Sequence, residues 1–335
     1  MTVSLLSHID IPPAYRPGFA AAGVTLYVAP RTDHTGPLWP DGPLQPVLSA
    51  VGDAAEEETF DPGAIEVLLT IGSLGISAQD MAKLPALRLI CCLGVGYERV
   101  CLAAAAARGI SVTHGRGTND TSVADHALAL MLAVMRDIAP LDRAVRRGQW
   151  QDVRRLRPQP SGKRVGILGL GTIGRNIAER CARGFAMEVG YHNRRPVADS
   201  DYYYCASATA LAQWCDILVI ATPGGAATRH LVDAAVLEAL GAEGFLINIA
   251  RGSVVETAAL TAALQTQAIA GAALDVIEGE PEVPAALLAQ DNLLITPHVA
   301  ARSPQAMAAM YQQMLENLAR HLSGQPLLTP VAEKD

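Results

Sequence analysis

The chain has 335 residues, half of them hydrophobic, and a formal net charge of −7. A chain of this length and apolar content can bury a large core and favours about two domains, which excludes disorder for most of it. The acidic balance lacks the basic surface that nucleic-acid binding requires. The sequence has neither a charged-then-apolar leader nor an apolar stretch of about 18 residues, so we expect a cytoplasmic protein that does not bind membranes.

The six cysteines follow neither a metal-binding nor a secreted disulfide pattern. Two of them, Cys91 and Cys92, are adjacent at the end of a predicted strand and would point to opposite faces of a sheet. We therefore expect buried or idle thiols and no metal site. Only three of the 26 basic residues are lysines, so a single arginine is less informative here than in an average chain.

The first part of the chain predicts a small α/β unit. Residues 1–60 contain many prolines and glycines with weak periodicity, and we assign them only to the edge of this unit. Short apolar runs then predict buried strands, and two segments between them have helical character. The strands are expected at 65–71, 87–92 and 110–113, and the helices at 78–84 and 103–108.

A helical arm follows this unit. The pattern at 121–136 predicts a long helix with Thr121 or Ser122 as its N-terminal cap, and a second helix is expected at 140–148. The segment 151–161 contains prolines and arginines, which predict a polar break before the next strand.

From residue 162 onward, strand and helix patterns alternate. Apolar runs are separated by segments of helical period, which is typical of a parallel, doubly wound α/β sheet covered on both faces. The final helical pattern, at 304–322, is expected to pack on the first unit. The strands are expected at 164–168, 188–192, 216–221, 244–250, 271–276 and 293–296.

A glycine fingerprint joins the first of these strands to a helix expected at 175–185. Gly169 permits a tight turn, Gly171 lets a pyrophosphate approach the backbone, and Gly174 lets the helix lie close to the sheet. The helix N-terminus, with unpaired N–H groups, favours an anion. The spacing alone is a weak signal, but the strand before it and the helix after it predict a dinucleotide-binding site.

Further landmarks follow one another along the chain. They are Leu87-Arg88-Leu89-Ile90, Gly94-Val95-Gly96-Tyr97, Ser122-Val123-Ala124-Asp125-His126-Ala127-Leu128, Ile247-Asn248-Ile249-Ala250-Arg251-Gly252, Gly271-Ala272-Ala273-Leu274-Asp275-Val276, Glu280-Pro281 and Thr296-Pro297-His298. In this order, and together with the glycine fingerprint, they resemble the D-isomer-specific 2-hydroxyacid dehydrogenases over residues 65–322.

The resemblance implies a Rossmann-type dinucleotide-binding domain at 102–301 and a smaller, flavodoxin-like α/β domain for the substrate, built from both chain ends at 1–101 and 302–335. The active site would lie in the cleft between the domains, and the helical arm would contact the second subunit of a homodimer. The chain departs from the family pattern at Asp125, at Ile277 and in the run Ala301-Arg302-Ser303. Arg302 would either alter substrate preference or face solvent.

Three residues would carry the reaction that the resemblance implies, the reduction of a 2-keto acid by a hydride. His298 is the candidate general acid, because imidazole gives and takes protons near neutrality. Glu280 would bond its second ring nitrogen, and Arg251 would hold the substrate carboxylate. Outside this family context, Glu280 fits an exposed turn, Arg251 a strand cap, and His298 a surface or core histidine. His126, on an apolar helix, is expected to be a packed histidine.

Further contacts are expected with the substrate and the cofactor. Gly94-Val95-Gly96 follows a buried strand, so its N–H groups are free to form an anion-binding concavity, and the resemblance places the substrate carboxylate there, opposite 71–74. The expected substrate contacts are Ser73, Leu74, Val95, Gly96 and Arg251. The expected cofactor contacts are Gly169, Gly171, Thr172, Ile173, Gly174, Asn193, Arg194, Arg195, Thr222, Pro223, Ala250 and Asp275.

The end of the second strand after residue 162 bears on the choice of coenzyme. An NAD site usually has an acidic residue here for the ribose 2′-hydroxyl, but this chain has Asn193, followed by Arg194 and Arg195. The missing carboxylate and the two guanidinium groups predict that NADPH is preferred over NADH. The run Tyr191-His192-Asn193-Arg194-Arg195 also resembles the glyoxylate/hydroxypyruvate reductase branch.

We therefore expect an NADPH-dependent reductase of a small 2-keto acid, glyoxylate or hydroxypyruvate, that forms the D-hydroxy acid. Two alternatives stay open: a dehydrogenase of a bulkier 2-hydroxy acid, and a cofactor-sensing interaction protein on the same scaffold, as some corepressors related to this family are. An interaction protein has no need of Glu280 and His298 together. The sequence does not rank the keto acids or give the direction of the reaction in the cell.

Overall fold

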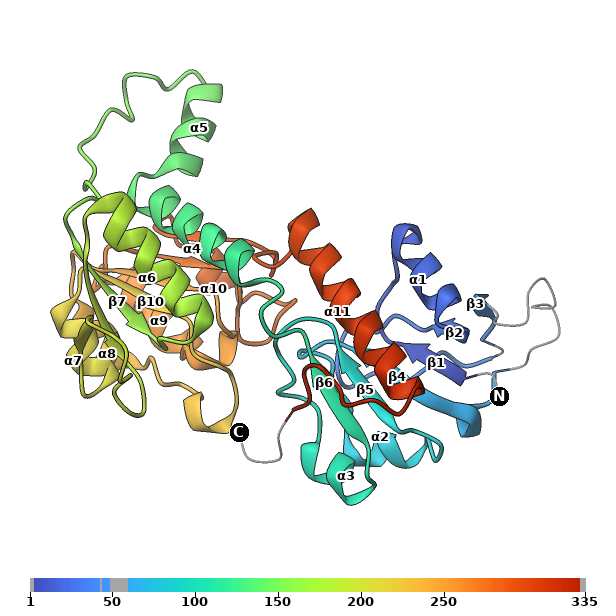
Figure 1. Ribbon diagram of the computed structural model, residues 1–335. Helices are drawn as coiled ribbons and strands as arrows, with labels where there is room; N and C mark the ends of the chain where they lie inside the picture. The colour runs from blue at the N-terminus through green and yellow to red at the C-terminus, as the bar shows by residue number, and fades with distance from the viewer. Residues whose placement is uncertain (1–2, 43, 49–59, 332–335) are drawn as a thin grey trace. The chain divides into compact units, whose positions relative to one another are not determined.

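The computed structural model describes residues 3–42, 44–48 and 60–331. The chain forms two compact units, one of residues 1–119 with 304–335 and one of residues 120–303 (Figure 1). Each unit is built on a mainly parallel sheet with helices between the strands, so the predicted α/β class is confirmed.

The first unit contains a sheet with the strand order β3-β2-β1-β4-β5-β6. Neighbouring strands are parallel except for β2 and β3, which are antiparallel. Without the edge strand β3, this is the 2-1-3-4-5 order of flavodoxin-like folds. The strands are β1 (Val3–Ser7), β2 (Val24–Val28), β3 (Pro46–Leu48), β4 (Ile65–Thr70), β5 (Leu89–Cys92) and β6 (Ser111–His114), and the helices are η1 (Pro13–Tyr15), α1 (Arg16–Ala21), η2 (Pro62–Ala64), α2 (Ala78–Ala82), α3 (Leu102–Ala107) and α11 (Pro304–Leu322).

The N-terminal segment supplies an inner strand of this sheet, and the prediction for residues 1–60 is therefore incomplete. Strand β1 lies between β2 and β4, and its Leu5 and Leu6 are fully buried. Part of the segment, residues 1–2, 43 and 49–59, lies outside the described residues.

Two hydrophobic clusters cover the two faces of this sheet. Along β5, Leu89 and Cys91 belong to one cluster and Ile90 and Cys92 to the other, as the two-residue period of a strand requires. Burial raises the pKa of the Cys91 thiol to about 11, so this thiol stays protonated and unreactive. All six cysteines are free and all but Cys101 are buried, which confirms the prediction of buried or idle thiols.

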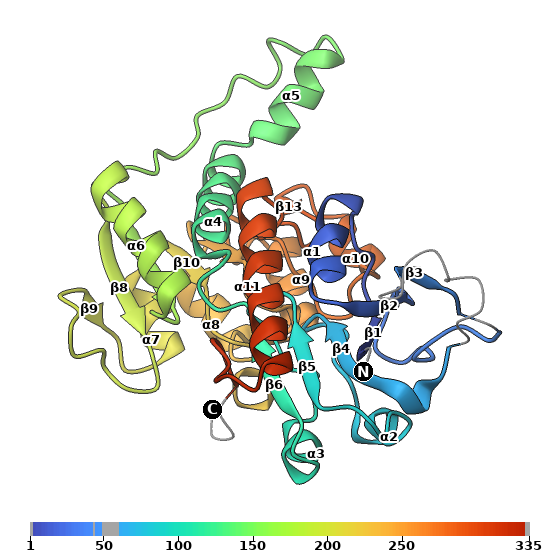
Figure 2. The ribbon, with the colours of Figure 1, turned by 45° about the vertical axis from the view of Figure 1, so that its right-hand side comes forward.

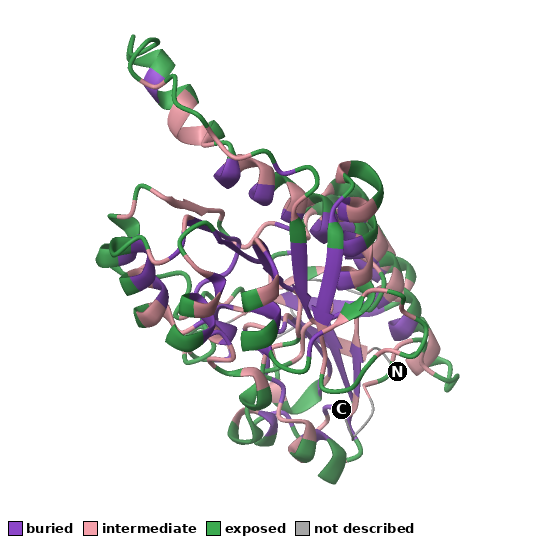
Figure 3. Ribbon diagram, turned by 90° about the vertical axis from the view of Figure 1, so that its left-hand side faces the viewer, coloured by how far each residue is buried: buried purple, intermediate pink, exposed green. Residues whose placement is uncertain are grey.

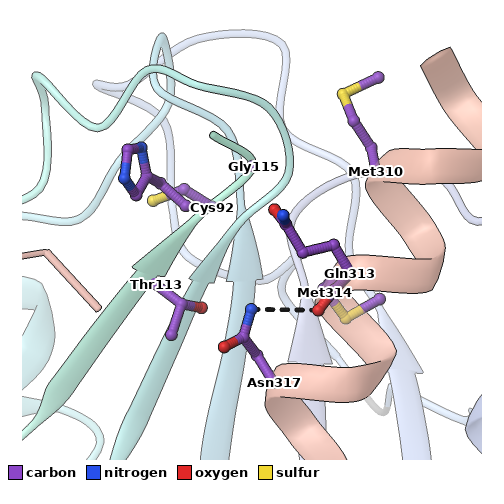
Figure 4. Close-up of a pocket in the computed structure, with 8 residues that line it drawn as sticks. Cys92, Thr113, Gly115, Met310, Gln313, Met314 and Asn317 are labelled. Carbon is purple, nitrogen blue, oxygen red and sulfur yellow. Dashed lines mark hydrogen bonds between the residues drawn. The ribbon is translucent and has the colours of Figure 1, made fainter. Parts of the chain in front are cut away.

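The C-terminal helix α11 packs on the first unit, as predicted. It contacts β5 and β6, and its side chains line a small pocket there together with Cys92 and Thr113 (Figure 4). Asn317 of α11 is 1% exposed, donates from Nδ2 to Gln313 O at 3.0 Å and accepts the N–H of Leu328 at 2.9 Å. This buried amide ties the end of the chain to the helix.

The second unit contains a fully parallel sheet with the order β13-β12-β11-β10-β7-β8-β9. Read from β9, the strands follow the 3-2-1-4-5-6 order of the Rossmann fold, and β13 extends it. The strands are β7 (Arg164–Leu168), β8 (Glu188–His192), β9 (Tyr203–Tyr204), β10 (Ile217–Ile220), β11 (Phe245–Asn248), β12 (Gly271–Leu274) and β13 (Leu293–Ile295). The helices are α4 (Asp120–Met135), α5 (Ile138–Arg146), α6 (Thr172–Phe185), α7 (Ala208–Trp214), η3 (Ala226–Thr228), α8 (Ala234–Leu240), η4 (Gly252–Val254), α9 (Thr257–Gln265) and α10 (Ala285–Leu288).

Helices cover both faces of the second sheet. Leu211 of α7 and Leu237 of α8 belong to one hydrophobic cluster, whereas Leu130 of α4 and Ile177 of α6 belong to the other. Burial of the strands is nearly continuous, and the helices expose one side to solvent (Figure 3). This is the pattern of a parallel sheet that is buried on both faces.

Several predicted boundaries differ from the observed ones. Helix α4 begins at Asp120, so neither Thr121 nor Ser122 is its cap, and α6 begins at Thr172 rather than at 175. Residues 102–119 lie in the first unit because β6 pairs with β5, whereas the sequence places the boundary at 101.

The arm after α4 extends away from the sheet of the second unit (Figure 2). It consists of α5 and the segment up to β7, which contains no helix or strand, in agreement with the predicted break at 151–161. Among the described residues, no helix has both the length and the apolar character needed to cross a bilayer. The cytoplasmic location remains a prediction.

Candidate active site

The turn between β7 and α6 is closed by two glycines that have no room for a side chain. Gly169 has φ +103°, and a Cβ atom on it would lie 2.7 Å from the backbone nitrogen of Thr222, at the end of β10. A Cβ on Gly174 would collide with the carbonyl oxygen of Gly169. These two glycines therefore let β7, β10 and α6 approach one another closely.

Gly171 differs from these two glycines, because a Cβ on it would meet nothing within 4 Å in the described chain. It is the exposed N-terminal cap residue of α6 and has φ −82°, a conformation open to any residue. Neither packing within the described chain nor the backbone conformation therefore requires a glycine at this position. The lack of a side chain leaves the backbone N–H groups at the start of α6 open to a ligand, which is the cradle that a dinucleotide pyrophosphate requires.

Asn193 follows β8 and reaches the same turn. Its side-chain oxygen accepts the N–H of Leu170 at 2.7 Å, so the amide holds the turn rather than standing apart from it. The next two residues, Arg194 and Arg195, are exposed, and neither guanidinium forms an ion pair or hydrogen bond within the described residues. The structure thus places a neutral amide and two solvated cations beside the glycine turn.

Asn248, at the end of β11, organises the turn that carries Arg251. Its amide is 1% exposed, accepts the N–H of Ala250 at 3.0 Å and donates to the carbonyl of Arg251 at 3.1 Å. The stem of Arg251 passes close to Gly224, where a Cβ would lie 2.7 Å from Cγ of the arginine. Gly252 packs on the backbone of Ile277 so closely that a Cβ would collide with it. The turn after β11 is therefore fitted against the turn after β12.

The turn after β12 presents Glu280 to His298, which follows β13. Nδ1 of His298 lies 2.6 Å from Oε1 of Glu280, and the other oxygen, Oε2, accepts the N–H of Ile277 at 3.3 Å. Burial raises the pKa of Glu280, but the hydrogen bond and charge of His298, with smaller contributions from Ile277 and the Arg251 guanidinium, outweigh it and hold this pKa below its ordinary value. Glu280 is therefore an ionised partner for an imidazolium.

Asp275 fixes the loop that carries His298. This carboxylate is 1% exposed and accepts hydrogen bonds from the hydroxyl of Thr296 at 2.6 Å and from the N–H groups of Val299 and Ala300, both at 2.9 Å. Its backbone carbonyl accepts the N–H of His298 at 2.8 Å. The side chain of Asp275, which was predicted to contact the cofactor, is thus hydrogen-bonded to the loop of His298. No sequence pattern indicated these bonds.

The predicted substrate contacts on the first unit lie on two adjacent loops. A Cβ on Gly72 would lie 2.6 Å from the carbonyl carbon of Gly96, so the loop of Ser73 packs against the loop after β5. The carbonyl of Val95 lies 3.0 Å from Nδ1 of His114. Leu74 is buried, so its contribution to a binding surface would come from its backbone. Whether these residues bind a substrate stays a prediction.

The remaining predicted contacts are distributed around the glycine turn and the strand ends. Thr172 is exposed as the first residue of α6, while Ile173 packs partly against the core. Thr222 and Pro223 follow β10, and the side chain of Thr228 donates to the carbonyl of Pro223 at 2.7 Å. Arg302 is exposed, which agrees with the interpretation that it faces solvent.

Comparison with known proteins assigns this architecture. The model of the "D-isomer specific 2-hydroxyacid dehydrogenase, NAD binding domain" matches residues 128–300, more than half of the chain. The chain belongs to the D-isomer specific 2-hydroxyacid dehydrogenases. It is an oxidoreductase of this family with a nicotinamide cofactor, and the glycine turn described above fits that cofactor.

Similar members of the family are named for several keto acids. The chain is 40% identical to the 2-ketogluconate reductase of Gluconobacter oxydans and 41% identical to a glyoxylate/hydroxypyruvate reductase of Arabidopsis thaliana, in both cases over 80% of this chain and 86% of the relative. The structure of the NADPH-dependent glyoxylate/hydroxypyruvate reductase of Sinorhizobium meliloti, in complex with NADP and malonate, matches with a TM-score of 0.86 and 33% identity, over 99% of this chain and 98% of that one.

Three residues that shape the site were not assigned a role from the sequence, although Asn248 and Thr296 belong to the landmark runs. Asn248 ends a buried strand, and a polar residue at that place is a signal that sequence reasoning could have used. Gly224 and Thr296 act through contacts with Arg251 and Asp275, which lie far from them in the sequence.

Among the described residues, no group of three histidine, cysteine, aspartate or glutamate side chains is placed to hold a metal ion.

Proposed function

We propose that this chain reduces glyoxylate or hydroxypyruvate to the D-2-hydroxy acid with NADPH. The observation that carries the proposal is the hydrogen-bonded pair of His298 and Glu280, with the charge of Arg251 acting on the same carboxylate. These three residues follow β11, β12 and β13, neighbouring strands whose carboxyl ends share one edge of the sheet. Ligands of open α/β sheets bind at that edge.

The residues divide the chemistry among them. The bound NADPH would supply a hydride to the carbonyl carbon, and Arg251 would hold the substrate carboxylate through parallel hydrogen bonds. Because Nδ1 of His298 faces Glu280, Nε2 is the ring nitrogen left to give a proton to the carbonyl oxygen. The proton and the hydride together complete the alcohol, the ring becomes neutral, and Glu280 stabilises the ring while it is protonated.

The preference for NADPH rests on the residues after β8. A carboxylate there would accept from a ribose 2′-hydroxyl and repel a 2′-phosphate, but Asn193 is neutral and already bonded to Leu170. The exposed guanidinium groups of Arg194 and Arg195 would instead pair with the phosphate. Replacing both by alanine should raise KM for NADPH about tenfold or more and leave KM for NADH within about twofold. An equal effect on both coenzymes would refute the phosphate contact.

Initial rates test the substrate class. Glyoxylate, hydroxypyruvate, pyruvate, phenylpyruvate and 2-ketogluconate are compared by kcat/KM with each coenzyme, and we expect the first two with NADPH to be fastest. The last compound represents the second candidate, a reductase of a bulkier acid, because a relative of 40% identity is named for it. Tight NADPH binding without turnover on any of the five would favour the cofactor sensor.

We also propose that the arm forms a homodimer contact. Trp150 is 61% exposed and Leu156 is fully exposed, and the arm carries further exposed apolar side chains at Ile138 and Val145. Apolar side chains gathered on one projecting segment are typical of an interface. Light scattering after gel filtration should give twice the monomer mass, and Leu156→Asp should lower it. A monomer in the unmodified protein would refute this proposal.

A further inference from the structure

One face of helix α4 holds both sides of the loop that carries His298. The hydroxyl of Ser122 donates to the carbonyl of Ala300 at 2.7 Å, and Nε2 of His126 lies 3.0 Å from Oγ1 of Thr296. Residues four apart share a face of a helix. The two contacts therefore flank His298 symmetrically, two residues before it and two residues after it.

The direction of these hydrogen bonds follows from the proton of Thr296. Its hydroxyl gives its single proton to the buried carboxylate of Asp275, 2.6 Å away, so it can only accept from His126. Nε2 of His126 must therefore carry a proton. The same nitrogen lies 3.4 Å from Oδ1 of Asp275. His126 was predicted to be a packed histidine, but it has a polar partner and its side chain is 23% exposed.

The loop needs such support because its backbone is strained at the functional residue. His298 has φ +53°, in the left-handed region that is unfavourable for a residue with a Cβ. Such a conformation persists only where the surrounding structure determines it. Asp275 holds the loop from the sheet side, and α4 holds it through Ser122 and His126.

We propose that His126 is a positioning residue for His298: its Nε2–H, through Thr296 and Asp275, keeps the loop in the conformation that directs the His298 ring at Glu280 and the substrate. The part of this inference that concerns catalysis rests on the proposed function. His126 itself touches neither of the reacting groups, and its effect passes through Thr296.

Three variants of α4 separate this role from a general effect on the helix. His126→Leu removes the donor, His126→Gln restores an N–H at nearly the same reach, and Asp125→Asn is the control, because Asp125 pairs with Arg180 on the exposed side of the same helix. Ser122→Ala tests the other contact between α4 and the loop, the hydrogen bond of Ser122 to Ala300. Should the leucine variant not fold, His126→Asn takes its place with the same expected results, because its shorter amide cannot bring an N–H as far as Thr296.

Two readouts are measured on the full chain. Exchange of the amide hydrogens within residues 296–300, all of which have one except Pro297, should be about tenfold faster or more in His126→Leu and in Ser122→Ala without cofactor. It should be close to unmodified in His126→Gln and unchanged in Asp125→Asn. The kcat for the keto acid should fall about tenfold in His126→Leu and recover in His126→Gln, while KM for NADPH stays within about twofold.

The outcomes are distinguishable. Unchanged exchange of residues 296–300 in His126→Leu overturns the inference, whatever the protein reduces. Faster exchange with an unaltered kcat overturns the link from the loop to catalysis. If the unmodified protein reduces no keto acid, the proposed function fails. Faster exchange in the leucine variant would still support the role of His126 in holding the loop of His298.

Discussion

The Nδ1 atom of His298 lies 2.6 Å from Oε1 of Glu280, although the two residues come from turns after different strands. The pair depends on two loops that are fixed separately: Glu280 Oε2 bonds the N–H of Ile277, and the loop of His298 is held by Asp275. Its geometry makes one ring nitrogen a donor to a carboxylate and leaves the other for a substrate.

Removing the charge of Glu280 should destabilise the protonated imidazole ring of His298. Because the pKa of Glu280 lies below its ordinary value, the carboxylate stays ionised in moderate acid, and its stabilising contribution is lost only as the pH falls through that lowered pKa. In Glu280→Gln we expect kcat/KM for reduction to fall about 100-fold at neutral pH and to decline at a lower pH than in the unmodified enzyme. Rates from about pH 5 to about pH 9 test this, with Glu278→Gln as the control. Profiles of the same shape and height would contradict it.

Replacing each of the two glycines at the start of α6 by alanine should affect a different property of the protein. Gly171→Ala adds a methyl group where nothing in the described chain lies within 4 Å, so unfolding should be unchanged while NADPH binding weakens about tenfold or more. Gly174→Ala drives a methyl group into the carbonyl of Gly169, so the fold itself should lose about 2 kcal/mol or more. Urea unfolding and NADPH fluorescence titration measure the two effects. Normal NADPH affinity in Gly171→Ala would show that the pyrophosphate does not bind at this turn.

Arg251 should not tolerate replacement by lysine, although the charge is kept. The planar guanidinium forms two parallel bonds to a carboxylate, whereas an ammonium group is a point charge. We expect Arg251→Lys to lower kcat/KM for the keto acid about 100-fold, mostly through KM, with NADPH binding preserved. Arg183→Lys, an exposed residue paired with Glu179, is the matched control. Kinetics of Arg251→Lys near those of the control would exclude the arginine from the site.

His8 should make the first unit sensitive to acid. It is fully buried, and burial, followed by the charge of Arg31, lowers its pKa from 6.5 to about 3. The unfolded chain therefore binds a proton that the folded chain does not, and stability falls as the pH drops from about 6.5 toward about 3, by at most about 1.4 kcal/mol per pH unit.

The corresponding variant is His8→Leu, which should flatten this dependence. Urea unfolding at about pH 7 and at about pH 4.5 gives the two free energies of unfolding. Leu5→Ala on β1, the strand that precedes His8, should lose stability equally at both pH values, because it removes no titrating group. An undiminished pH dependence in His8→Leu would assign the acid sensitivity to other groups.

The sequence predicted what depends on local patterns. The strands β7 and β8 have the predicted bounds, because buried parallel strands are continuous apolar runs. The glycine turn was predictable for the same reason, since Gly169 and Gly174 follow such a strand at fixed positions. Family resemblance, rather than any local pattern, connected Glu280 with His298.

What the sequence did not predict depends on contacts between distant segments. β1 is short and follows no helical or alternating period, and it becomes an inner strand only by pairing with β2 and β4. Asp275 gives no local sign that it will hold residues 296–300, and His126 gives none that it will meet Thr296. Such hydrogen bonds arise from the fold, and a single sequence carries no pattern for them.

The most direct test of the account is the rate of hydride transfer in His298→Asn, measured in single turnover with NADPH and glyoxylate. Asparagine tolerates the left-handed backbone at φ +53°, so the loop should stay in place while the proton donor is lost. We predict a rate about 10²-fold to 10⁴-fold lower, with the dissociation constant of NADPH within about twofold of the unmodified value. Hydride transfer at nearly the unmodified rate would contradict the assignment of His298 as the acid and, with it, the proposed reaction at this site.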